Sequence, residues 1–582
     1  LAELKEYEGA AKSFRSAIRF QQDMQKAHYH LGMAYRNLNN LDGAVSAFSE
    51  AVKLDDTDVE ANYYLGLTYF ELQKYEYAEK SFDSALLNEP GHYKSIYQLG
   101  MTYKNLNMLE EAIKQFSDAS TYNEASFDLF NNFGLTFYDL GENSGERSNY
   151  TNAVDRFTSA VKKNLESREA NYNLGLAYYR LGYEESSYFE NAIESFDNTI
   201  KLDPKYLNGY IKLVLSYLKK GRYEEAKDKL KNIKEMDPNN AVAYYLLGNC
   251  NRKMENQKGA IDAYHVSNSL DPTQSSIHDL LSWDNNQQGG NSYFHLGAVM
   301  VKSGGSEGAV DALKQSIALD PNHQQSQYYL GIAFRNLGNY DQSIMSLTSA
   351  TEMNKNDFKA FMDLGISYFE AGKFQQALTP FDEVINIPES DEDLKAEASY
   401  YRGRCYYNLA QYNEGIEALM GAVSRNTEVF NYYYHLGVSY LTNSEVDLEN
   451  PQFERAVEAF IQAISIEPEN SDAHYNLGVT YNHLGNFEQA VDEFDAAIKI
   501  DRENADTHFE LGKAYFALKR WDEALDSNKE AISYNPNHVG SHFQLGMTYL
   551  KLNDKGSAFD EYKVLKGLNQ DTADDLFDSI YK

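Results

Sequence analysis

Apolar residues recur at helical spacing along most of the chain, in short stretches separated by polar turns. Residues 474–506 show the pattern well, because two such stretches follow one another there. The apolar positions of the two stretches are Leu477, Tyr481 and Leu484, then Phe487, Ala490, Val491, Phe494 and Ile498. Gly485 and Asn486 between them form a turn signal. The pattern therefore predicts two short helices joined by a tight turn.

Two of the residues expected to be buried in this helix pair are small. Gly478 and Ala490 would let two helix backbones approach closely, and Tyr481 and Phe494 would fill the wider gaps beside them. A single helix pair cannot bury its apolar face, so it needs a similar pair on each side.

The chain supplies such neighbours, because the glycine of this pattern recurs throughout it. Equivalents of Gly478 are Gly32, Gly66, Gly100, Gly134, Gly175, Gly248, Gly297, Gly331, Gly365, Gly403, Gly437, Gly512 and Gly546. One further copy is centred on Val214 and lacks the glycine. Of these 15 copies, 13 have Leu directly before the glycine position, and the dominant step between copies is 34 residues. The chain therefore consists of about 15 repeats of one helix pair.

This pattern resembles the tetratricopeptide repeat (TPR), a 34-residue unit marked by Leu-Gly-x-x-Tyr, a small residue, an aromatic residue and a proline. The resemblance covers essentially the full chain. It implies an all-α fold, a right-handed superhelical solenoid of TPR helix-turn-helix repeats. Such a repeat specifies the fold but says little about function.

The repeats divide the chain into five predicted parts. These are an N-terminal half repeat (1–24), a TPR sub-solenoid (25–272), an inter-repeat insertion (273–290), a second TPR sub-solenoid (291–570) and a C-terminal capping helix (571–582). The insertion is taken as the best boundary in the chain because a short apolar patch and then a polar, Gly- and Asn-rich run interrupt the repeats there.

Both ends of the chain depart from the repeat pattern. Residues 3–20 match only a second helix, which leaves open whether a first helix, a signal or an anchor precedes it. A bare second helix also leaves open head-to-tail self-association through the termini. Residues 573–582 carry an apolar stripe of the kind that a capping helix requires. The stripe consists of Ala573, Leu576, Phe577 and Ile580.

Polar insertions interrupt several repeats. Segments 141–150, 182–190 and 442–452 lie between the two helices of a repeat, and 386–397 lies between two repeats. Their content of Gly, Ser, Asn and acidic residues predicts surface loops.

The charge of the chain restricts its partners. Its 53 basic and 87 acidic residues give a net charge of −34. Nucleic acid and anionic membrane surfaces would both be repelled at long range, so neither is expected as a partner. No apolar run reaches the ~18 residues that a membrane span needs, so no membrane insertion of this chain is expected.

The two cysteines occupy the same place in their repeats. Cys250 and Cys405 each lie two residues after the glycine position, where other repeats carry Ala, Thr or Ser. That place requires a small buried side chain, so inert packing is the favoured role for both thiols. They do not decide the compartment, which stays open between cytoplasmic and, if a signal has been removed, secreted or periplasmic.

In TPR proteins the first helix of each repeat lines a concave groove. The resemblance implies that the inward side chains lie three residues before, and one, four and five after, the glycine position. The site three before is aromatic in 12 of the 15 repeats, and packing is its favoured role. Tyr172, Tyr245 and Tyr328 are nevertheless candidate groove residues, because they lie in the repeats that also carry basic groups.

Basic residues gather four and five residues after the glycine position in the middle of the chain. They are Arg180, Lys219, Arg252, Lys253, Lys302 and Arg335. A solvated face with its own acidic neighbours is the favoured interpretation, and capture of acidic peptide segments or a terminal carboxylate is the functional one. The Lys, Asn and Arg set of chaperone-binding TPR proteins matches only at Asn249. The asparagine ladder of TPR glycosyltransferases matches only at Asn132, Asn173 and Asn476, so neither site is carried over.

No pattern for catalysis, a cofactor or a metal ion appears. The Gly-rich segment 302–308 lacks the strand and the Gly-Lys-Ser/Thr of a phosphate loop. His474, His508 and His542 occupy one site in three successive repeats, but packed helices are ~8–10 Å apart, too far for them to share one zinc ion. We therefore expect no enzyme activity and no cofactor.

The sequence thus predicts a non-enzymatic scaffold that binds segments of partner proteins in a groove. Two other functions stay open: a structural protein that assembles head-to-tail into an oligomer or fibre, and the regulatory TPR array of a larger enzyme.

Overall fold

The computed structural model describes residues 2–122, 126–283 and 291–582, apart from the side chains of 2–4 and 281–283. The described residues form 33 α-helices and no strand, as the sequence predicts. They divide into two compact parts, Leu1–Ser292 and Tyr293–Lys582, here called the N-terminal part and the C-terminal part. The boundaries predicted from the sequence, including the insertion at 273–290, stay a prediction.

The N-terminal part contains helices α1 to α16. Their bounds are α1 (Ala2–Phe20), α2 (Gln25–Asn37), α3 (Leu41–Leu54), α4 (Val59–Glu71), α5 (Tyr75–Asn88), α6 (Tyr93–Asn105), α7 (Leu109–Ala119), α8 (Phe127–Ser144), α9 (Arg147–Lys163), α10 (Arg168–Leu181), α11 (Tyr188–Leu202), α12 (Leu207–Lys219), α13 (Tyr223–Met236), α14 (Ala241–Lys253), α15 (Gln257–Leu270) and α16 (Ser275–Trp283).

The C-terminal part contains helices α17 to α33. Their bounds are α17 (Ser292–Lys302), α18 (Ser306–Leu319), α19 (Gln324–Asn336), α20 (Tyr340–Met353), α21 (Phe358–Glu370), α22 (Phe374–Asn386), α23 (Glu392–Asn408), α24 (Tyr412–Arg425), α25 (Phe430–Val446), α26 (Phe453–Ile466), α27 (Ser471–Leu484), α28 (Phe487–Ile500), α29 (Ala505–Ala517), α30 (Trp521–Tyr534), α31 (Val539–Lys551), α32 (Lys555–Leu568) and α33 (Gln570–Tyr581).

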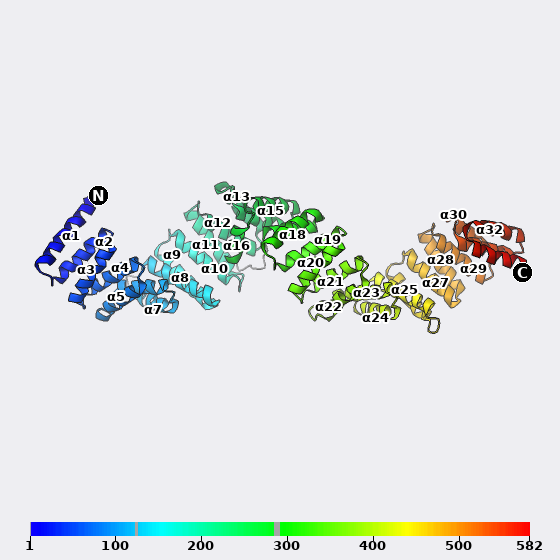
Figure 1. Cartoon of the computed structure of the whole chain (residues 1–582), viewed down its shortest axis with the longest axis horizontal. Coiled ribbons are helices and arrows are strands. Elements are labelled where there is room, and N and C mark those ends of the chain that lie inside the picture. The colour runs from blue at the N-terminus through cyan, green and yellow to red at the C-terminus, as the bar shows by residue number, and fades with distance from the viewer. Residues whose placement is uncertain (1, 123–125, 284–290) are drawn as a thin grey trace. The chain divides into compact units, whose positions relative to one another are not determined.

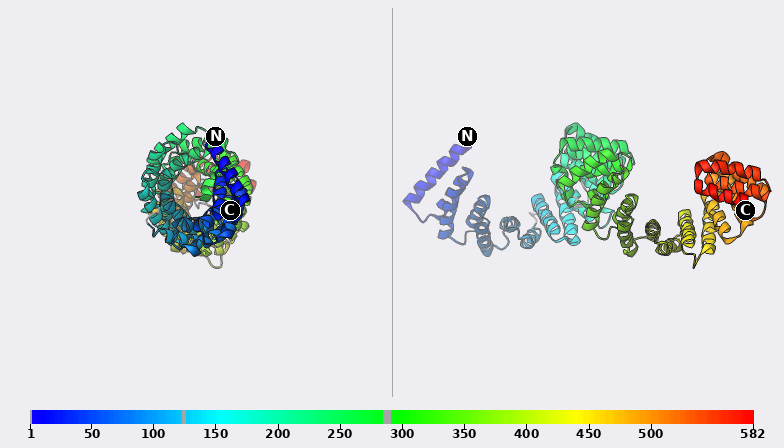
Figure 2. Two further views of the ribbon diagram at one scale, coloured as in Figure 1. Left: turned by 90° about the vertical axis from the view of Figure 1, so that its left-hand side faces the viewer. Right: turned by 45° about the vertical axis from the view of Figure 1, so that its right-hand side comes forward.

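Within each part, most helices pack against the next one along the chain, whereas α16 packs against α14. Figures 1 and 2 show these neighbours side by side, for example α2 with α3 and α27 with α28. The helix that carries the glycine position is called the first helix of a repeat, and the one after it the second helix. Their alternation confirms the solenoid of helix pairs.

In most repeats the glycine lets an aromatic side chain of the second helix reach the first. A methyl group on Gly478 would lie 2.7 Å from the ring of Phe494, which is too close for two carbon atoms. Phe494 and Ala490 are both fully buried in this crossing. The same crossing pairs Gly32 with Phe48, and several repeats between them repeat it. The close approach predicted from the small residues is therefore confirmed.

One repeat replaces that buried aromatic residue with a polar one. At the crossing of Gly512 the side chain facing the glycine is Asn528, which is fully buried. Its Nδ2 donates to the carbonyl of Ala524 at 2.7 Å in its own helix. Its Oδ1 has no hydrogen-bond partner among the described residues. The crossings of Gly297, Gly331 and Gly403 use leucine instead.

The turn after the first helix has a fixed backbone conformation. The residue seven places after the glycine position adopts a positive φ in 12 repeats, whatever its type. Gly485 is one example, with φ of 76°, whereas Ala410 and Lys519 adopt φ of 56° and 61° at the same place. This left-handed conformation costs little for glycine and more for residues with a Cβ.

The insertion 141–150 is not the surface loop that its composition predicts. Helix α8 continues to Ser144 and α9 begins at Arg147, so only Gly145 and Glu146 lie between them. Gly145 ends α8 with φ of 71°. The ring of Tyr150 fills the space beside Gly141, where a methyl group would lie 2.8 Å from it. Aromatic packing between two lengthened helices therefore outweighs the loop-forming composition. Segment 442–452 is likewise helical as far as Val446 in α25, and 386–397 is helical from Glu392 in α23.

The last helix, α33, packs against α31 and α32. Ala573, Leu576 and Ile580 are buried there, while Phe577 is partly exposed. Leu576 fills the space beside Gly546 that second-helix aromatic residues fill elsewhere. The capping role of 571–582 stays a prediction, and this burial supports it.

Candidate functional site

Consecutive first helices are joined by polar side chains. In three places, the tyrosine three residues before the glycine position bonds to the residue two before the glycine of the next repeat. Tyr97 accepts from Asn132 at 3.1 Å, and Tyr434 accepts from Asn476 at 3.3 Å. Tyr328 donates to Asp363 at 2.8 Å. We call these bonds rungs. They place the residues expected to line a groove on one face, the first-helix face.

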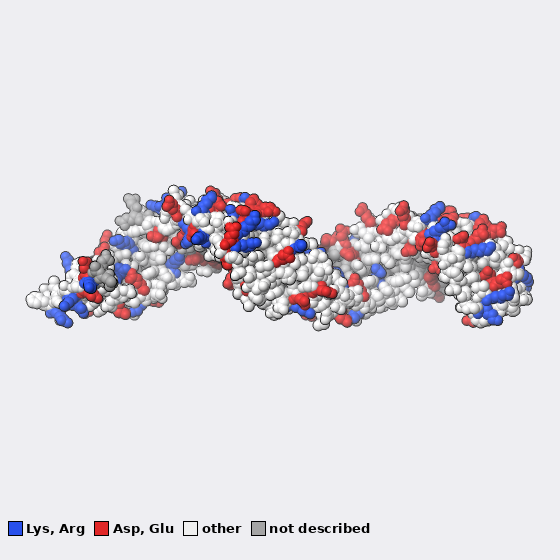
Figure 3. Space-filling view, turned by 90° about the horizontal axis from the view of Figure 1, so that it is seen from above, with Lys and Arg blue, Asp and Glu red and all other residues white. Residues whose placement is uncertain are grey.

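The predicted basic site residues are divided between the two parts of the chain. Arg180, Lys219, Arg252 and Lys253 belong to the N-terminal part, and Lys302 and Arg335 to the C-terminal part. On the face drawn in Figure 3, basic side chains lie among acidic ones rather than in one continuous basic area. The environment of each basic residue therefore decides whether it is available to a partner.

Arg180 is buried and engaged inside the protein. Its side chain is 4% exposed, and Nη2 donates to Glu142 Oε2 at 2.6 Å. Its Nε donates to the hydroxyl oxygen of Tyr138 at 3.2 Å. Tyr150 donates to the other carboxylate oxygen of Glu142 at 2.8 Å. These bonds tie α10 to α8 and α9, which is a structural role.

Arg335 is engaged in a similar way. Its Nη1 donates to Asp363 Oδ1 at 2.7 Å, and Tyr328 donates to Oδ2 of the same carboxylate. Burial, and then the charge of Asp363, raise the pKa of Tyr328, so its phenol stays protonated and donates. Arg335, Tyr328 and Asp363 together make a rung strengthened by charge.

The other basic site residues are more open. The ammonium of Lys219 lies 4.5 Å from the ring centre of Tyr183. Arg252 Nε donates to the hydroxyl of Tyr264 at 3.4 Å, and that hydroxyl donates to Asn249 at 2.8 Å. Lys253 and Lys302 are exposed. This leaves Arg252 and Lys253, adjacent at the end of α14, as the basic pair available to a partner.

Two of the three tyrosines named as site residues pack inside the repeats. Tyr245 is 2% exposed and its ring centre lies 6.2 Å from that of Tyr264. Tyr172 packs on Phe196 at 5.8 Å and on Tyr206 at 5.2 Å. With Tyr328 in a rung, all three tyrosines are engaged by packing or hydrogen bonding within the protein.

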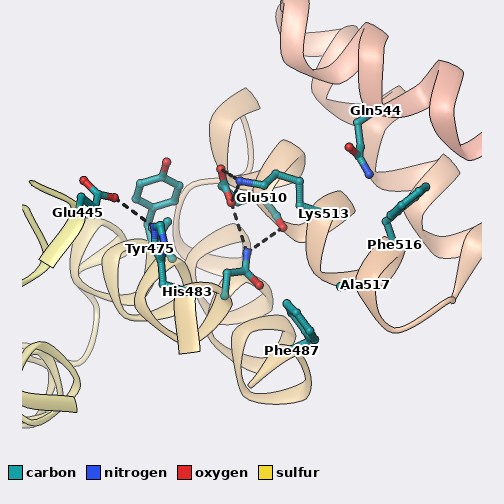
Figure 4. A pocket seen from close by; sticks show the side chains of 11 residues that line it. Glu445, Tyr475, His483, Phe487, Glu510, Lys513, Phe516, Ala517 and Gln544 are labelled. Atoms are coloured by element: carbon teal, nitrogen blue, oxygen red, sulfur yellow. Dashed lines mark hydrogen bonds and ion pairs between the residues drawn. The ribbon is translucent and has the colours of Figure 1, made fainter. Parts of the chain in front are cut away.

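The C-terminal part contains a pocket that the sequence does not single out (Figure 4). It has a volume of about 650 Å³, and most of its lining residues belong to first helices. Its lining comes from α25, α27, α28, α29 and α31. The residues are Glu445, Tyr475, Val479, Asn482, His483, Phe487, Glu510, Lys513, Phe516, Ala517 and Gln544.

The central helix of this pocket presents the four positions that the resemblance implies for a groove. Tyr475 lies three residues before Gly478, and Val479, Asn482 and His483 lie one, four and five after it. The volume is in the usual range for ligand pockets, ~300–1,000 Å³.

Some polar groups that line the pocket are paired with neighbouring side chains, and others are open to a ligand. Lys513 donates to both carboxylate oxygens of Glu510 at 2.8 Å, and Asn482 Nδ2 lies 3.3 Å from Glu510 Oε2. His483 Nε2 lies 3.1 Å from Glu445, whose side chain is 44% exposed. The hydroxyl of Tyr475 has no hydrogen-bond partner among the described residues.

A signal for this pocket exists in the sequence. The site two before the glycine carries polar residues that form rungs, and Glu510 occupies it in the repeat after Tyr475. Comparison of this site with an asparagine ladder alone does not reveal the pocket, because a charged residue there can turn away from the tyrosine.

Cysteine and metal chemistry contribute no site. Cys250 and Cys405 are fully buried, as predicted, and burial raises the pKa of each thiol to about 12. The described residues contain no group of three or more His, Cys, Asp or Glu side chains placed to hold a metal ion. Over the same residues, no helix is long and apolar enough to cross a membrane.

Models of one repeat family match much of the chain. The model described as "TPR repeat" matches residues 32–73 and 480–519. Models described as "Tetratricopeptide repeat" match residues 93–126, 138–206, 211–273, 299–347, 331–393, 459–492 and 505–538. Together they cover well over half of the chain.

One curated relative is anaphase-promoting complex subunit 3 of Schizosaccharomyces pombe, 25% identical over 163 residues. The match covers 28% of this chain and 22% of the relative, so the chain matches about a fifth of that protein's length.

Solved structures with similar helix arrangements include the APC/C hetero-tetramer Cut9-Hcn1. It is 13% identical, covers 90% of this chain and 96% of its own, and has a TM-score of 0.31. MamA from Desulfovibrio magneticus RS-1 is 25% identical over 31% of this chain and 94% of its own, with a TM-score of 0.27. YrrB, a TPR protein with an unusual peptide-binding site, is 22% identical, covers 34% of this chain and 95% of its own, and has a TM-score of 0.30.

Proposed function

Because this chain belongs to the tetratricopeptide repeat family, we propose that it is a non-enzymatic scaffold that binds segments of partner proteins on its first-helix face. One observation carries the proposal. The four groove positions of a single repeat, occupied by Tyr475, Val479, Asn482 and His483, line a pocket of about 650 Å³ on that face.

We further propose that the N-terminal part prefers acidic segments at the end of α14. Arg252 and Lys253 are adjacent there, and Lys253 is exposed. Arg180 has no part in this proposal, because Glu142 and Tyr138 engage its guanidinium. Arginine pairs with a carboxylate through two parallel hydrogen bonds, which favours an aspartate, a glutamate or a chain terminus as the partner group.

The test is binding of a fluorescent acidic peptide to the full chain, measured by anisotropy at rising salt. We expect saturable binding that weakens as salt rises. The double change Arg252→Glu and Lys253→Glu should lower the affinity about tenfold or more. Lys162→Glu with Lys163→Glu is the matched control, because this exposed adjacent pair ends the second helix α9.

Equal binding of a basic peptide would contradict the acidic preference. An equal loss in the control would also contradict it, because the effect would then come from net charge and not from the site. Circular dichroism of both double variants checks that the helices remain folded.

Self-association through the termini remains a second candidate. The ring of Phe20, at the end of α1, is 94% exposed, and such a ring can pack against another molecule. Light scattering against concentration, with and without residues 571–582, tests it. A monomer at every concentration would exclude assembly of this chain.

A further inference from the structure

The pocket in the C-terminal part combines carboxylates with aromatic walls. Glu445 enters it from α25, and Glu510 from α29. The rings of Tyr475, Phe487 and Phe516 line the space around them (Figure 4). A basic side chain needs this combination, because its methylene stem packs on apolar surface while its charged end pairs with a carboxylate or an aromatic face.

At this pocket, the tyrosine three residues before the glycine position makes no rung, unlike its equivalents in three other repeats. Tyr97, Tyr328 and Tyr434 each bond to the polar residue two before the next glycine position. For Tyr475 the residue at that place is Glu510. Lys513 holds both oxygens of that carboxylate at 2.8 Å, and Asn482 approaches it from the other side at 3.3 Å.

The hydroxyl of Tyr475 is therefore left without a partner among the described residues, and it lines an open space. On the side of the preceding repeat stands Glu445, 44% exposed, and among the described residues only the ring of His483 engages it. A carboxylate has about four lone-pair positions, so Glu445 can accept further hydrogen bonds. The pocket thus offers a carboxylate and a phenol oxygen that can each accept a hydrogen bond from a ligand.

The electrostatic field at the pocket is negative. Burial, and then the charges of Glu510, Asp506 and Glu445, raise the pKa of Tyr475 to about 12. The same field attracts a cation from solution, and the net charge of −34 adds to it at long range. Lys513 offsets one of the two lining carboxylates, which leaves Glu445 as the carboxylate available to a ligand.

We propose that this pocket binds a single basic side chain, arginine or lysine, of a partner segment, with its charged end at Glu445 and the hydroxyl of Tyr475 and its stem against the aromatic rings. The proposal rests on the proposed function, since it names what one part of the first-helix face recognises. It is independent of the acidic preference at Arg252 and Lys253, which lie in the other part of the chain.

The experiment uses the full chain and five decapeptides of Gly, Ser and Leu that differ only at one central residue. That residue is arginine, lysine, citrulline, alanine or glutamate, and citrulline keeps the shape of arginine without its charge. Fluorescence anisotropy should show saturable binding of the arginine or the lysine peptide. The citrulline peptide should bind at least about tenfold more weakly, because a hydrogen bond to a charged group contributes about 1.5–3 kcal/mol.

Two variants locate the site. Glu445→Gln removes the exposed charge and should weaken binding of the arginine peptide about tenfold. Tyr475→Phe removes only the hydroxyl group and should weaken binding of the same peptide several-fold. The matched control is Glu454→Gln, an exposed glutamate on the second helix α26, which should leave the affinity unchanged.

Three results would overturn the proposal: tighter binding of the glutamate peptide, equal binding of the citrulline and arginine peptides, or no effect of Glu445→Gln. Absence of binding of both basic peptides up to about 1 mM would also overturn it. The change of Arg252 and Lys253 to glutamate should not weaken binding of the arginine peptide. If the basic peptides fail to bind while the acidic peptide still binds, the proposal for this pocket is wrong and the proposed scaffold function is unaffected.

Discussion

Nδ1 of His542 lies 2.6 Å from Oε2 of Glu561, so the first helix α31 and the second helix α32 share a charged hydrogen bond. The other ring nitrogen, Nε2, lies 3.0 Å from the carbonyl oxygen of Pro536. Both neighbours of the ring are acceptors, so the imidazole can satisfy both only when both nitrogens carry a proton. Two repeats earlier, His474 makes the same pair of contacts with Glu493 and Pro468.

The first prediction is that the stability of α31 and α32 falls as pH rises. The hydrogen bond to Glu561 raises the pKa of His542, and burial opposes this. Because the pKa of His542 is higher in the folded state, its pair with Glu561 contributes fully to stability below the unfolded pKa of about 6.5. That contribution is lost as pH rises through the folded pKa. Hydrogen exchange of α31 and α32 should show Glu561→Gln losing about 1 kcal/mol of protection at pH 5.5 and less at pH 8.5.

The comparison between wild type and variant at each pH removes the intrinsic pH dependence of exchange. A difference that stays constant from pH 5.5 to 8.5 would show that the pair is not protonated as argued. The unit of His508 provides an internal reference, because Ser527 stands there in the place of the glutamate.

The second prediction concerns the helix crossing. Ala490 is fully buried beside Phe494, so Ala490→Leu adds volume where none is free and should cost about 1–3 kcal/mol. Glu488→Gln, exposed on the same helix, should be near neutral. Urea unfolding followed by circular dichroism measures both. Equal effects of the two changes would mean that the repeat register is wrong.

The third prediction is a stabilising change. Asn528 is fully buried with an unpaired Oδ1, and leucine occupies the same place at three other crossings. Asn528→Leu keeps the branched shape of the side chain and removes an unsatisfied acceptor, so it should add about 1–2 kcal/mol to stability. Thermal unfolding measures this as a higher midpoint. A lower midpoint would contradict the argument. Asn535→Leu, outside the helices, serves as a control for added hydrophobicity.

The fourth prediction concerns the turn. Lys519 has φ of 61°, where Gly485 stands in the preceding repeat. Because the left-handed conformation costs about 1 kcal/mol for a residue with a Cβ, Lys519→Gly should stabilise the repeat by up to that amount. Gly485→Ala is the reciprocal change and should destabilise by a similar amount. Denaturant midpoints check the pair, and shifts of the same sign would refute the explanation.

The repeat itself could be predicted from the sequence because its physical cause is local. Gly478 and Phe494 are 16 residues apart, and helical spacing alone brings them to one crossing. The turn after α27 follows from Gly485 and Asn486. By contrast, Glu142 falls in a segment rich in Gly, Ser and Asn, and only aromatic packing of Tyr150 explains why it is helical.

The candidate site depends on choices between neighbouring side chains, and for that reason it was only partly predictable. Arg335 is one of the predicted basic residues, but whether it faces solvent depends on Asp363, 28 residues later. Glu510 could bond to Tyr475 of the preceding repeat or to Lys513, three residues later on its own helix, and the repeat pattern does not decide between them. In the structure Lys513 holds Glu510, and the hydroxyl of Tyr475 has no hydrogen-bond partner among the described residues.

The crossing of glycine with an aromatic ring also bears on how this chain can change in length. Gly32, Gly66 and Gly100 present nearly identical surfaces, each with its ring from Phe48, Phe82 or Phe116. Loss or duplication of 34 consecutive residues in this stretch would therefore join one such surface to its equivalent, with no new interface to evolve. We therefore expect the length of this molecule to change in whole steps of one repeat, each of which leaves the remaining recognition surfaces chemically unchanged.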